Sequence, residues 1–337
     1  MIDTTGETPP TKSVVNYTTQ WDIYGIDWCE YDKEESIQRL LISSYKYDYC
    51  NKLQVLQFDE ESSTIKTLHE IDAIYPPTKV MWAPSPYSYH TDVFAFSGDY
   101  IRIYRLDGNS SVPIVDAILN KDNSPDRCSP VSSFDWSPFN TNIIAATCLD
   151  SVCTIWDIDA QQPISKVKAH SKEIYDIAFS QNNSNTFITC GEDGSIRLFD
   201  IRSIDQYSIV HQNSPATPIL RMAWNPGNFS TIAFLSKDDS SISLVDLRNP
   251  KSCLPMKSHT APVNAIMWSA VMPQYLVSAG EDSRCLIWDF EKLSGDHEFE
   301  PSYIYTTPAP INNVNWSKKN CSWIALSYEQ TLQLCRT

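Results

Sequence analysis

Apolar and aromatic residues recur at a long, regular interval along this chain of 337 residues. Seven short segments each end in an aromatic residue that has an apolar residue two places before it. These segments are residues 24–28, 78–82, 132–136, 175–179, 220–224, 264–268 and 312–316. Their aromatic ends lie 43 to 54 positions apart. A period of this length indicates propeller blades rather than helical repeats.

A second apolar run, a tight turn and a third apolar run follow each of these segments. Examples are residues 142–159, 187–202, 231–248 and 275–291. Alternation and β-branched content predict strands, and the polar Asp, Gly and Ser clusters between them predict hairpin turns. No long amphipathic helix is evident. The pattern therefore predicts an all-β protein, a single seven-bladed propeller over residues 1–337.

The last repeat is one strand short. Its three apolar runs lie near residues 311–316, 323–328 and 331–336, after which the sequence ends. Residues 13–20, SVVNYTTQ, precede the first repeat and have strand character. We expect this N-terminal strand to complete the seventh blade, because closure of the ring removes two exposed sheet edges.

The third runs carry a recognisable ending. Trp-Asp stands at Trp156 and Asp157 and again at Trp288 and Asp289, and the fourth repeat has Phe199 before an Asp. In these positions the chain resembles the WD-repeat proteins. That resemblance implies a hydrogen-bonded structural tetrad in a blade, made of a His, a Ser or Thr, a turn Asp and the Trp.

Two repeats match the tetrad. The sixth repeat supplies His259, Ser278, Asp282 and Trp288. The fourth supplies His170, Thr189 and Asp193 but has Phe199 in place of Trp, so we expect its network to end one bond short.

The same residue types, Ser, His and Asp, also make hydrolase sites, so a catalytic interpretation competes with the structural one. A nucleophilic serine must be exposed beside an oxyanion hole, whereas Ser278 lies inside a predicted strand. A buried indole N–H and a half-buried imidazole both need hydrogen-bond partners, which this set provides. No GxSxG, GxxxxGK or HExxH motif is present. We therefore expect a structural role and no enzyme activity.

Charge and cysteine content limit the classes of partner and ligand that we expect. The chain has 41 acidic and 26 basic residues, a net charge of −15, which disfavours direct binding to nucleic acid or to an anionic membrane and favours a basic protein partner. The N-terminus lacks an apolar signal region, so we expect a soluble protein of the cytoplasm and nucleus. Ten cysteines without a CxxC pair predict structural thiols, with neither a metal nor a cofactor.

Six strings resemble a narrower group, the anthocyanin-regulator and Transparent Testa Glabra proteins, whose animal members are called cullin-4-associated factors. They are residues 51–63, 76–84, 97–106, 132–138, 169–180 and 311–316. The resemblance implies a non-enzymatic scaffold, here expected to be monomeric. Its implied partners are dual-specificity tyrosine-regulated and homeodomain-interacting kinases, or helix-loop-helix and MYB transcription regulators. A modified-peptide reader and a substrate receptor of a cullin-4 ubiquitin ligase remain as alternatives.

Two unusually long loops are candidates for partner binding. Residues 44–51 contain Tyr45, Tyr47 and Tyr49, which offer rigid amphipathic contact area. The other loop, at residues 119–130, has three charged candidates. These are Asp122, Asp126 and Arg127. The alternative is a pair of solvated loops whose tyrosines only cover neighbouring strands.

Two arginines end consecutive repeats at equivalent positions, Arg202 and Arg248. Their contexts, FDIR and VDLR, are similar to the W-D-x-R signature with which WD-repeat receptors engage the cullin-4 adaptor, although both lack the Trp. We expect them on one rim, where they would bind the adaptor. The competing interpretation pairs each arginine with a nearby carboxylate such as Asp200 or Asp246.

Overall fold

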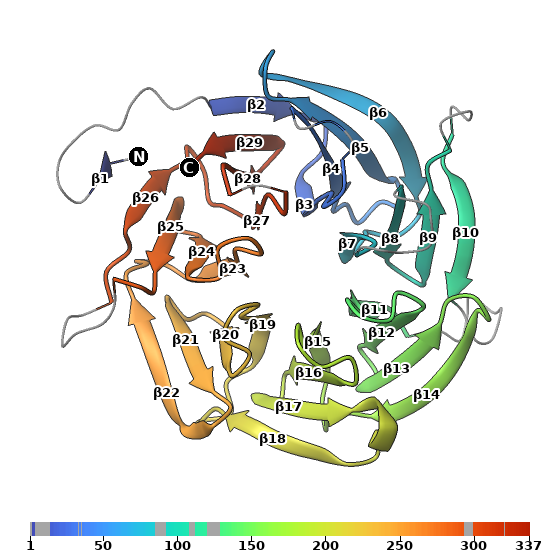
Figure 1. The fold of residues 1–337 in the computed structure, drawn as a ribbon, viewed down its shortest axis with the longest axis vertical. Helices are drawn as coiled ribbons and strands as arrows, with labels where there is room; N and C mark the ends of the chain where they lie inside the picture. Colours follow the sequence, from blue (N-terminus) through green and yellow to red (C-terminus); the bar gives the residue numbers. More distant parts are fainter. Residues whose placement is uncertain are drawn as a thin grey trace.

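Seven antiparallel sheets stand around a central axis (Figure 1). The computed structural model describes residues 2–3, 14–32, 34, 36–84, 92–107, 112–119, 129–292, 299–319 and 321–337. Within each blade the strands follow one another from the axis outward, as the repeat pattern predicts. The all-β, seven-bladed propeller expected from the sequence is confirmed.

The blades take their strands in chain order. Blade 1 comprises β3 (Ile23–Trp28), β4 (Ile37–Ser44), β5 (Asn51–Asp59) and β6 (Thr64–Ala73). Blade 2 comprises β7 (Lys79–Trp82), β8 (Val93–Ser97), β9 (Ile101–Arg105) and β10 (Ile114–Leu119). Blade 3 comprises β11 (Val131–Trp136), β12 (Ile143–Cys148), β13 (Val152–Asp157) and β14 (Gln162–Lys168). Blade 4 comprises β15 (Ile174–Phe179), β16 (Thr186–Gly191), β17 (Ser195–Asp200) and β18 (Tyr207–Gln212).

The remaining blades bring the two ends of the chain together. Blade 5 comprises β19 (Ile219–Trp224), β20 (Thr231–Ser236), β21 (Ser241–Asp246) and β22 (Asn249–Lys257). Blade 6 comprises β23 (Val263–Trp268), β24 (Tyr275–Gly280), β25 (Arg284–Asp289) and β26 (Tyr303–Thr306), with β1 (Ile2–Asp3) paired to β26. Blade 7 comprises β27 (Asn313–Trp316), β28 (Trp323–Tyr328), β29 (Thr331–Arg336) and β2 (Val14–Thr18).

Helical structure contributes little to the described residues. A short 3-10 helix, η2 (Ile201–Ser203), follows β17. In the part of the chain that the structure describes, no helix is long and apolar enough to cross a membrane.

Apolar side chains fill the seven interfaces between blades. Among the described residues the buried hydrophobic side chains form seven clusters, and each cluster draws on two neighbouring blades. Between blades 7 and 1, for example, Phe58 meets Trp323 edge to face with ring centroids 4.8 Å apart. A blade therefore buries its sheet faces against its two neighbours rather than within itself.

Buried carboxylates join the innermost strands. Asp27 accepts a hydrogen bond of 2.8 Å from the backbone N–H of Trp82 in the next blade. In the same way, Asp135 accepts from the N–H of Phe179 at 2.7 Å. Backbone groups on the free edge of an inner strand would otherwise lack partners, so these side chains satisfy them across the blade boundary.

The N-terminal strand closes the ring, as the sequence predicts. β2 pairs antiparallel with β29, from Val14 opposite Cys335 to Thr18 opposite Thr331, and lies outside it in Figure 1. The hydroxyl of Tyr17 donates to the side-chain oxygen of Gln54 in blade 1 at 2.9 Å. The outermost strand of blade 7 thus also contacts its neighbour. The pairing of β1 with blade 6 was not foreseen from the sequence.

Because β2 closes the ring, substitutions at its two adjacent valines should differ in their effect on the free energy of unfolding. Val15 packs against the cluster between blades 7 and 1, whereas the side chain of Val14 is exposed. A Val15→Asp substitution should lower the free energy of unfolding by about 1–3 kcal/mol, because it places a charge against apolar side chains. Val14→Asp is the matched control and should have little effect. Urea unfolding of both variants measures this, and equal losses would contradict a packed closing strand.

Candidate functional site

The four tetrad side chains of blade 6 form a continuous hydrogen-bonded chain. The Nδ1 atom of His259 lies 3.0 Å from both carboxylate oxygens of Asp282, and its Nε2 lies 2.8 Å from Oγ of Ser278. The indole N–H of Trp288 donates to the same Oγ at 3.0 Å. A neutral imidazole protonated on Nδ1 satisfies every group, since Ser278 then donates to His259 and accepts from Trp288.

Blade 4 repeats this chain without its last member. His170 Nδ1 lies 2.9 Å from Asp193, and Nε2 lies 2.8 Å from Oγ1 of Thr189. Phe199 takes the place of the tryptophan and stacks on Phe187 with ring centroids 5.2 Å apart. The network therefore ends at the threonine, as the sequence predicts.

Neither network presents a nucleophile to solvent. Ser278 and Thr189 are fully buried within β24 and β16. Burial lowers the pKa of His259 and of His170 below the ordinary value, although the neighbouring aspartates oppose this effect. Burial also disfavours the charged form of Asp193, but hydrogen bonds from Ser195 and His170 outweigh it and hold its pKa below the usual range. Buried neutral imidazoles bound to carboxylates are structural parts of the blades.

Aromatic side chains gather on one face of the ring. The rings of Tyr24 and Tyr45 lie 5.1 Å apart, and Tyr45 and Tyr47 meet edge to face at 5.4 Å. Tyr49 meets Tyr75 at 5.6 Å. We call these five residues the tyrosine surface. Its outer members are well exposed, Tyr47 to 88% and Tyr49 to 66%.

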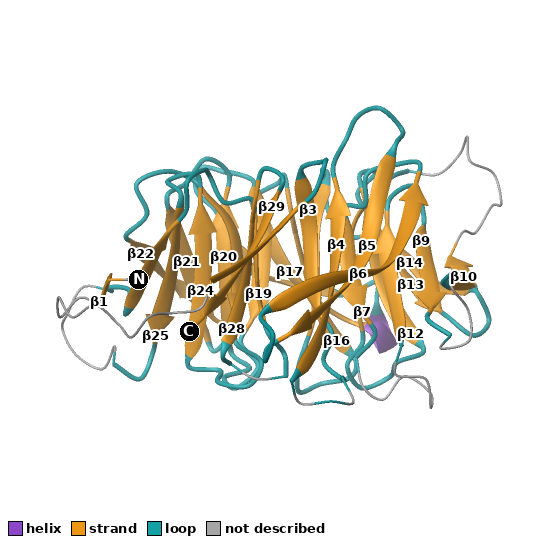
Figure 2. Cartoon of the chain, turned by 90° about the horizontal axis from the view of Figure 1, so that it is seen from above, coloured by secondary structure: helices purple, strands orange, loops and turns teal. Residues whose placement is uncertain are grey.

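The loop that carries Tyr45, Tyr47 and Tyr49 of the tyrosine surface is held in place by a buried asparagine. It joins β4 to β5 and rises above the neighbouring loops in Figure 2. The side-chain oxygen of Asn51 accepts from the hydroxyl of Ser44 at 2.9 Å and from the N–H of Lys46 at 2.8 Å, and its amide donates to the carbonyl of Lys46. Tyr49 has a φ of 56°, a left-handed conformation that costs roughly 1–2 kcal/mol in a non-glycine residue. Strained residues held by their surroundings cluster at functional sites.

The three charged candidates of the second loop, Asp122, Asp126 and Arg127, lie outside the described residues. Their predicted role in partner binding stays a prediction.

Arg202 and Arg248 lie on the face opposite the tyrosine surface, because both follow the third strand of a blade. Figure 2 places η2, which contains Arg202, on the lower side. Each guanidinium binds the aspartate two residues before it, with Nη2–Oδ2 distances of 2.6 Å and Nε–Oδ1 distances of 3.0 Å. A hydrogen bond from Arg248 lowers the pKa of Asp246 to about 2. Both arginines are thus paired with a neighbouring aspartate, as the competing interpretation expects. Their side chains nevertheless remain 69% and 72% exposed.

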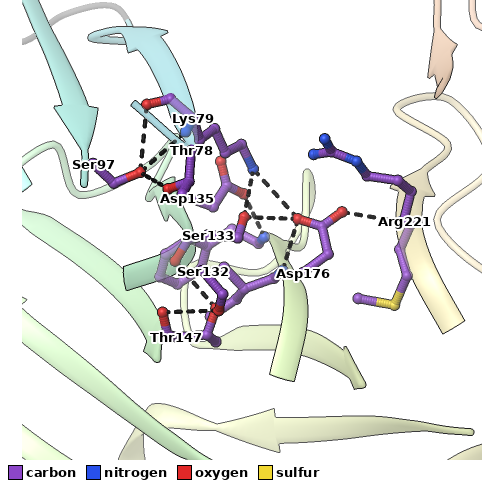
Figure 3. Close-up of polar contacts among 12 residues, drawn as sticks. Thr78, Lys79, Ser97, Ser132, Ser133, Asp135, Thr147, Asp176 and Arg221 are labelled. Atoms are coloured by element: carbon purple, nitrogen blue, oxygen red, sulfur yellow. Dashed lines mark hydrogen bonds and ion pairs between the residues drawn. The ribbon is translucent and has the colours of Figure 1, made fainter. Parts of the chain in front are cut away.

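The inner strands enclose a cavity of about 470 Å³ around the axis. Its lining includes Lys79, Asp176 and Arg221, which stand at the same repeat position, three residues before the aromatic. Figure 3 shows the ammonium of Lys79 and the guanidinium of Arg221 pointing toward one another over the Asp176 carboxylate. Sequence reasoning missed these residues, together with Tyr24 and Tyr75. A signal was available: charged residues occupy a position where the other blades have glycine, serine, alanine or asparagine.

The described residues contain no disulfide and no group of metal ligands. Their nine cysteines are free thiols, and burial raises the pKa of Cys153 and of Cys285. In the same part of the chain no three His, Cys, Asp or Glu side chains are grouped as metal ligands.

Comparison with known proteins agrees with the fold. Residues 124–157, 161–200 and 250–289 match the family model of the WD domain, G-beta repeat, so this protein is a WD-repeat β-propeller. Over 326 residues it is 31% identical to the DDB1- and CUL4-associated factor 7 homolog of Dictyostelium discoideum, covering 96% of this chain and 99% of the relative. The chain belongs to the DDB1- and CUL4-associated factor 7 family.

Two yeast proteins are also similar over most of this chain. A WD repeat-containing protein of Schizosaccharomyces pombe is 25% identical over 393 residues, covering 96% of this chain and 90% of the relative. A WD repeat-containing protein of Saccharomyces cerevisiae is 28% identical over 316 residues, which cover 83% of this chain and 59% of the relative.

The tetrad predicts different costs for two Trp→Phe substitutions. The indole N–H of Trp288 is hydrogen-bonded, whereas that of the equally buried Trp82 has no partner in the described part of the chain. Trp288→Phe should therefore lose about 0.5–1.5 kcal/mol more unfolding free energy than the control Trp82→Phe. Denaturant unfolding tests this, and a smaller loss at Trp288 would contradict a stabilising bond.

The lowered pKa values of His170 and His259 predict acid sensitivity. In the unfolded chain these histidines protonate as the pH falls through about 6.5, while the folded protein resists protonation at both. Their contribution to stability is therefore present above pH 6.5 and declines below it. The pH dependence of urea unfolding should weaken in His259→Gln, and a pH dependence equal to that of the wild type would contradict this contribution.

Proposed function

We propose that this protein is a non-enzymatic scaffold that docks regulatory proteins on the tyrosine surface. The observation that carries the proposal is a set of exposed tyrosines on a loop whose backbone is fixed by Asn51. Exposed aromatic rings that are already held in one arrangement bind at low entropic cost. The two histidine networks, by contrast, are buried in the blades, so a partner cannot contact them.

The partners we propose are those implied by the resemblance to the Transparent Testa Glabra group: dual-specificity tyrosine-regulated and homeodomain-interacting kinases, or transcription regulators. A net charge of −15 favours partners with a basic docking segment, through long-range attraction. Tyrosine faces also attract Lys and Arg side chains. We propose that the scaffold acts as a monomer in the cytoplasm and the nucleus.

A second function, as a receptor for a cullin-4 ubiquitin ligase, is favoured by Arg202 and Arg248. The Dictyostelium relative is named for an association with DDB1 and CUL4. Both arginines are exposed on the face away from the tyrosine surface, so one molecule has room for an adaptor and a docked protein at once. Adaptor binding would require a carboxylate of the adaptor to replace or to join Asp200 and Asp246, which hold the arginines in the free protein.

Separate variants of the two faces test both functions. The variant Tyr47→Ser with Tyr49→Ser should weaken binding of a purified dual-specificity tyrosine-regulated kinase by roughly thirtyfold or more, the loss typical of interface hot spots. It should leave binding of purified DDB1 unchanged. The variant Arg202→Ala with Arg248→Ala should show the opposite pattern. Surface plasmon resonance with the full chain immobilised measures all four affinities.

A Tyr207→Ser variant provides the control, because Tyr207 is an exposed tyrosine on the outer strand β18. Kinase binding that survives loss of Tyr47 and Tyr49 would refute docking on the tyrosine surface. Wild-type DDB1 affinity in the double arginine variant would refute the ligase role and leave the scaffold role standing.

A further inference from the structure

The residues three positions before each blade aromatic form one layer of the inner strands, and all of them except Ser133 line the central cavity. They are Gly25, Lys79, Ser133, Asp176, Arg221, Ala265 and Asn313. Two of the seven are cations and one is a carboxylate. Ala265, in the blade next to Arg221, has only a methyl side chain and lines the cavity.

The carboxylate of this layer already has a full set of donors. Oδ1 of Asp176 accepts from the Ser133 hydroxyl at 2.8 Å and from the N–H of Ile177 at 3.0 Å, and Lys79 lies 3.6 Å away. Oδ2 accepts from the N–H of Met222 in the next blade at 3.0 Å. Asp176 therefore serves mainly to join blades 4 and 5, and its carboxylate acts on Arg221 through space without a direct ion pair.

The cations of this layer, by contrast, have donors to spare. The guanidinium of Arg221 presents five N–H groups, of which one nitrogen, Nη2, lies 3.3 Å from the hydroxyl of Tyr24. Among the described residues no carboxylate oxygen lies within ion-pairing distance of Arg221. Lys79 has the Ser133 hydroxyl at 3.3 Å as its nearest hydrogen-bond partner. Arg221 has unused donors, and Lys79, which is paired with Asp176, points toward it, so the two cations together form a site that favours an anionic oxygen ligand.

This site is continuous with the tyrosine surface. Arg221 comes from β19 in blade 5 and reaches across the cavity to Tyr24 on β3 in blade 1 (Figure 1). The ring of Tyr24 contacts Tyr45, which contacts the exposed Tyr47. A peptide segment that contacts Tyr24 and Tyr45 would therefore be within reach of the Arg221 guanidinium.

We propose that Arg221 and Lys79, with the Tyr24 hydroxyl, bind the carboxylate of one Asp or Glu side chain from the segment that docks on the tyrosine surface. This inference rests on the proposed docking function and specifies its chemistry. Lys79 is paired with Asp176, and Lys318, which also lines the cavity, is paired with Asp27. Arg221 is the cation of this layer without an ion pair among the described residues, and a monoanion would supply one. Asp135, in the next layer of the same cavity, disfavours a doubly charged phosphate. A carboxylate also matches the planar guanidinium bidentately.

The test uses the full chain and a random twelve-residue peptide library displayed on phage. Selected peptides that compete with one another should share an Asp or Glu. In the synthetic peptide, replacing that residue by Asn or Gln should weaken binding roughly tenfold to a hundredfold, the range for a charge-assisted hydrogen-bonded pair. The Arg221→Gln protein should show the same loss with the original peptide and little further loss with the amide peptide.

Two further protein variants and one further peptide test whether Arg221 binds a carboxylate. Arg248→Gln removes the same charge on the opposite face and should bind normally. Tyr24→Phe keeps the ring, removes one hydroxyl and should cause a smaller loss, which tests the site even if Arg221→Gln is unstable. A phosphoserine peptide that binds tighter than its glutamate counterpart would overturn the assignment of a carboxylate.

Failure of this site can be told apart from failure of the docking function. Peptides that lose affinity with Tyr47→Ser but tolerate the amide replacement would refute the carboxylate site and leave the tyrosine surface intact. Selected peptides without a shared acidic residue would refute the site as well. Peptides insensitive to both Tyr47→Ser and Arg221→Gln would refute both.

Discussion

No blade of this propeller buries its own sheet faces, and this requirement for a neighbour governs the rest of the structure. Each of the seven apolar clusters of the described residues lies between two blades. The boundary between the last and first blades must be as well packed as the others, or two faces would meet water. Asn312 and Asn313 donate there to backbone carbonyls of β3, and β2 completes the outer edge.

The same requirement extends to polar groups. Inner strands have one edge without a partner strand, and Asp27, Asp135 and Asp176 satisfy N–H groups across blade boundaries. The turn aspartates Asp282 and Asp193 have a different role, because they bind buried histidines within their own blades. With so many carboxylates committed to structure, their presence near a serine or histidine is not evidence of catalysis. Polar groups with unused donors, such as Arg221, are better indicators of a binding site.

A ring built in this way leaves two loop faces for partners. The tyrosine surface occupies one face, and Arg202 and Arg248 occupy the other. The hydrogen-bonded blades lie between them, so the two faces are on opposite sides of the ring. A scaffold benefits from this separation, since a protein bound on one face does not compete with a protein bound on the other.

The sequence by itself determined the number of blades, the strand order, the closing strand and the tetrad, because each depends on local spacing that repeats every 43 to 54 residues. It also pointed to Tyr45, Tyr47 and Tyr49, since a long loop rich in tyrosine is visible in one dimension. Only the tertiary structure decided which residues join them. Tyr24 and Arg221 are 197 positions apart and meet because curvature of the ring brings blades 1 and 5 to opposite sides of one narrow cavity. Likewise, repeat positions predicted that Arg202 and Arg248 lie on one rim and left their pairing with Asp200 and Asp246 open. The side-chain geometry shows that both pairs form. Repeat spacing fixes where a residue stands in its blade, whereas the neighbours across the axis depend on how all seven blades close.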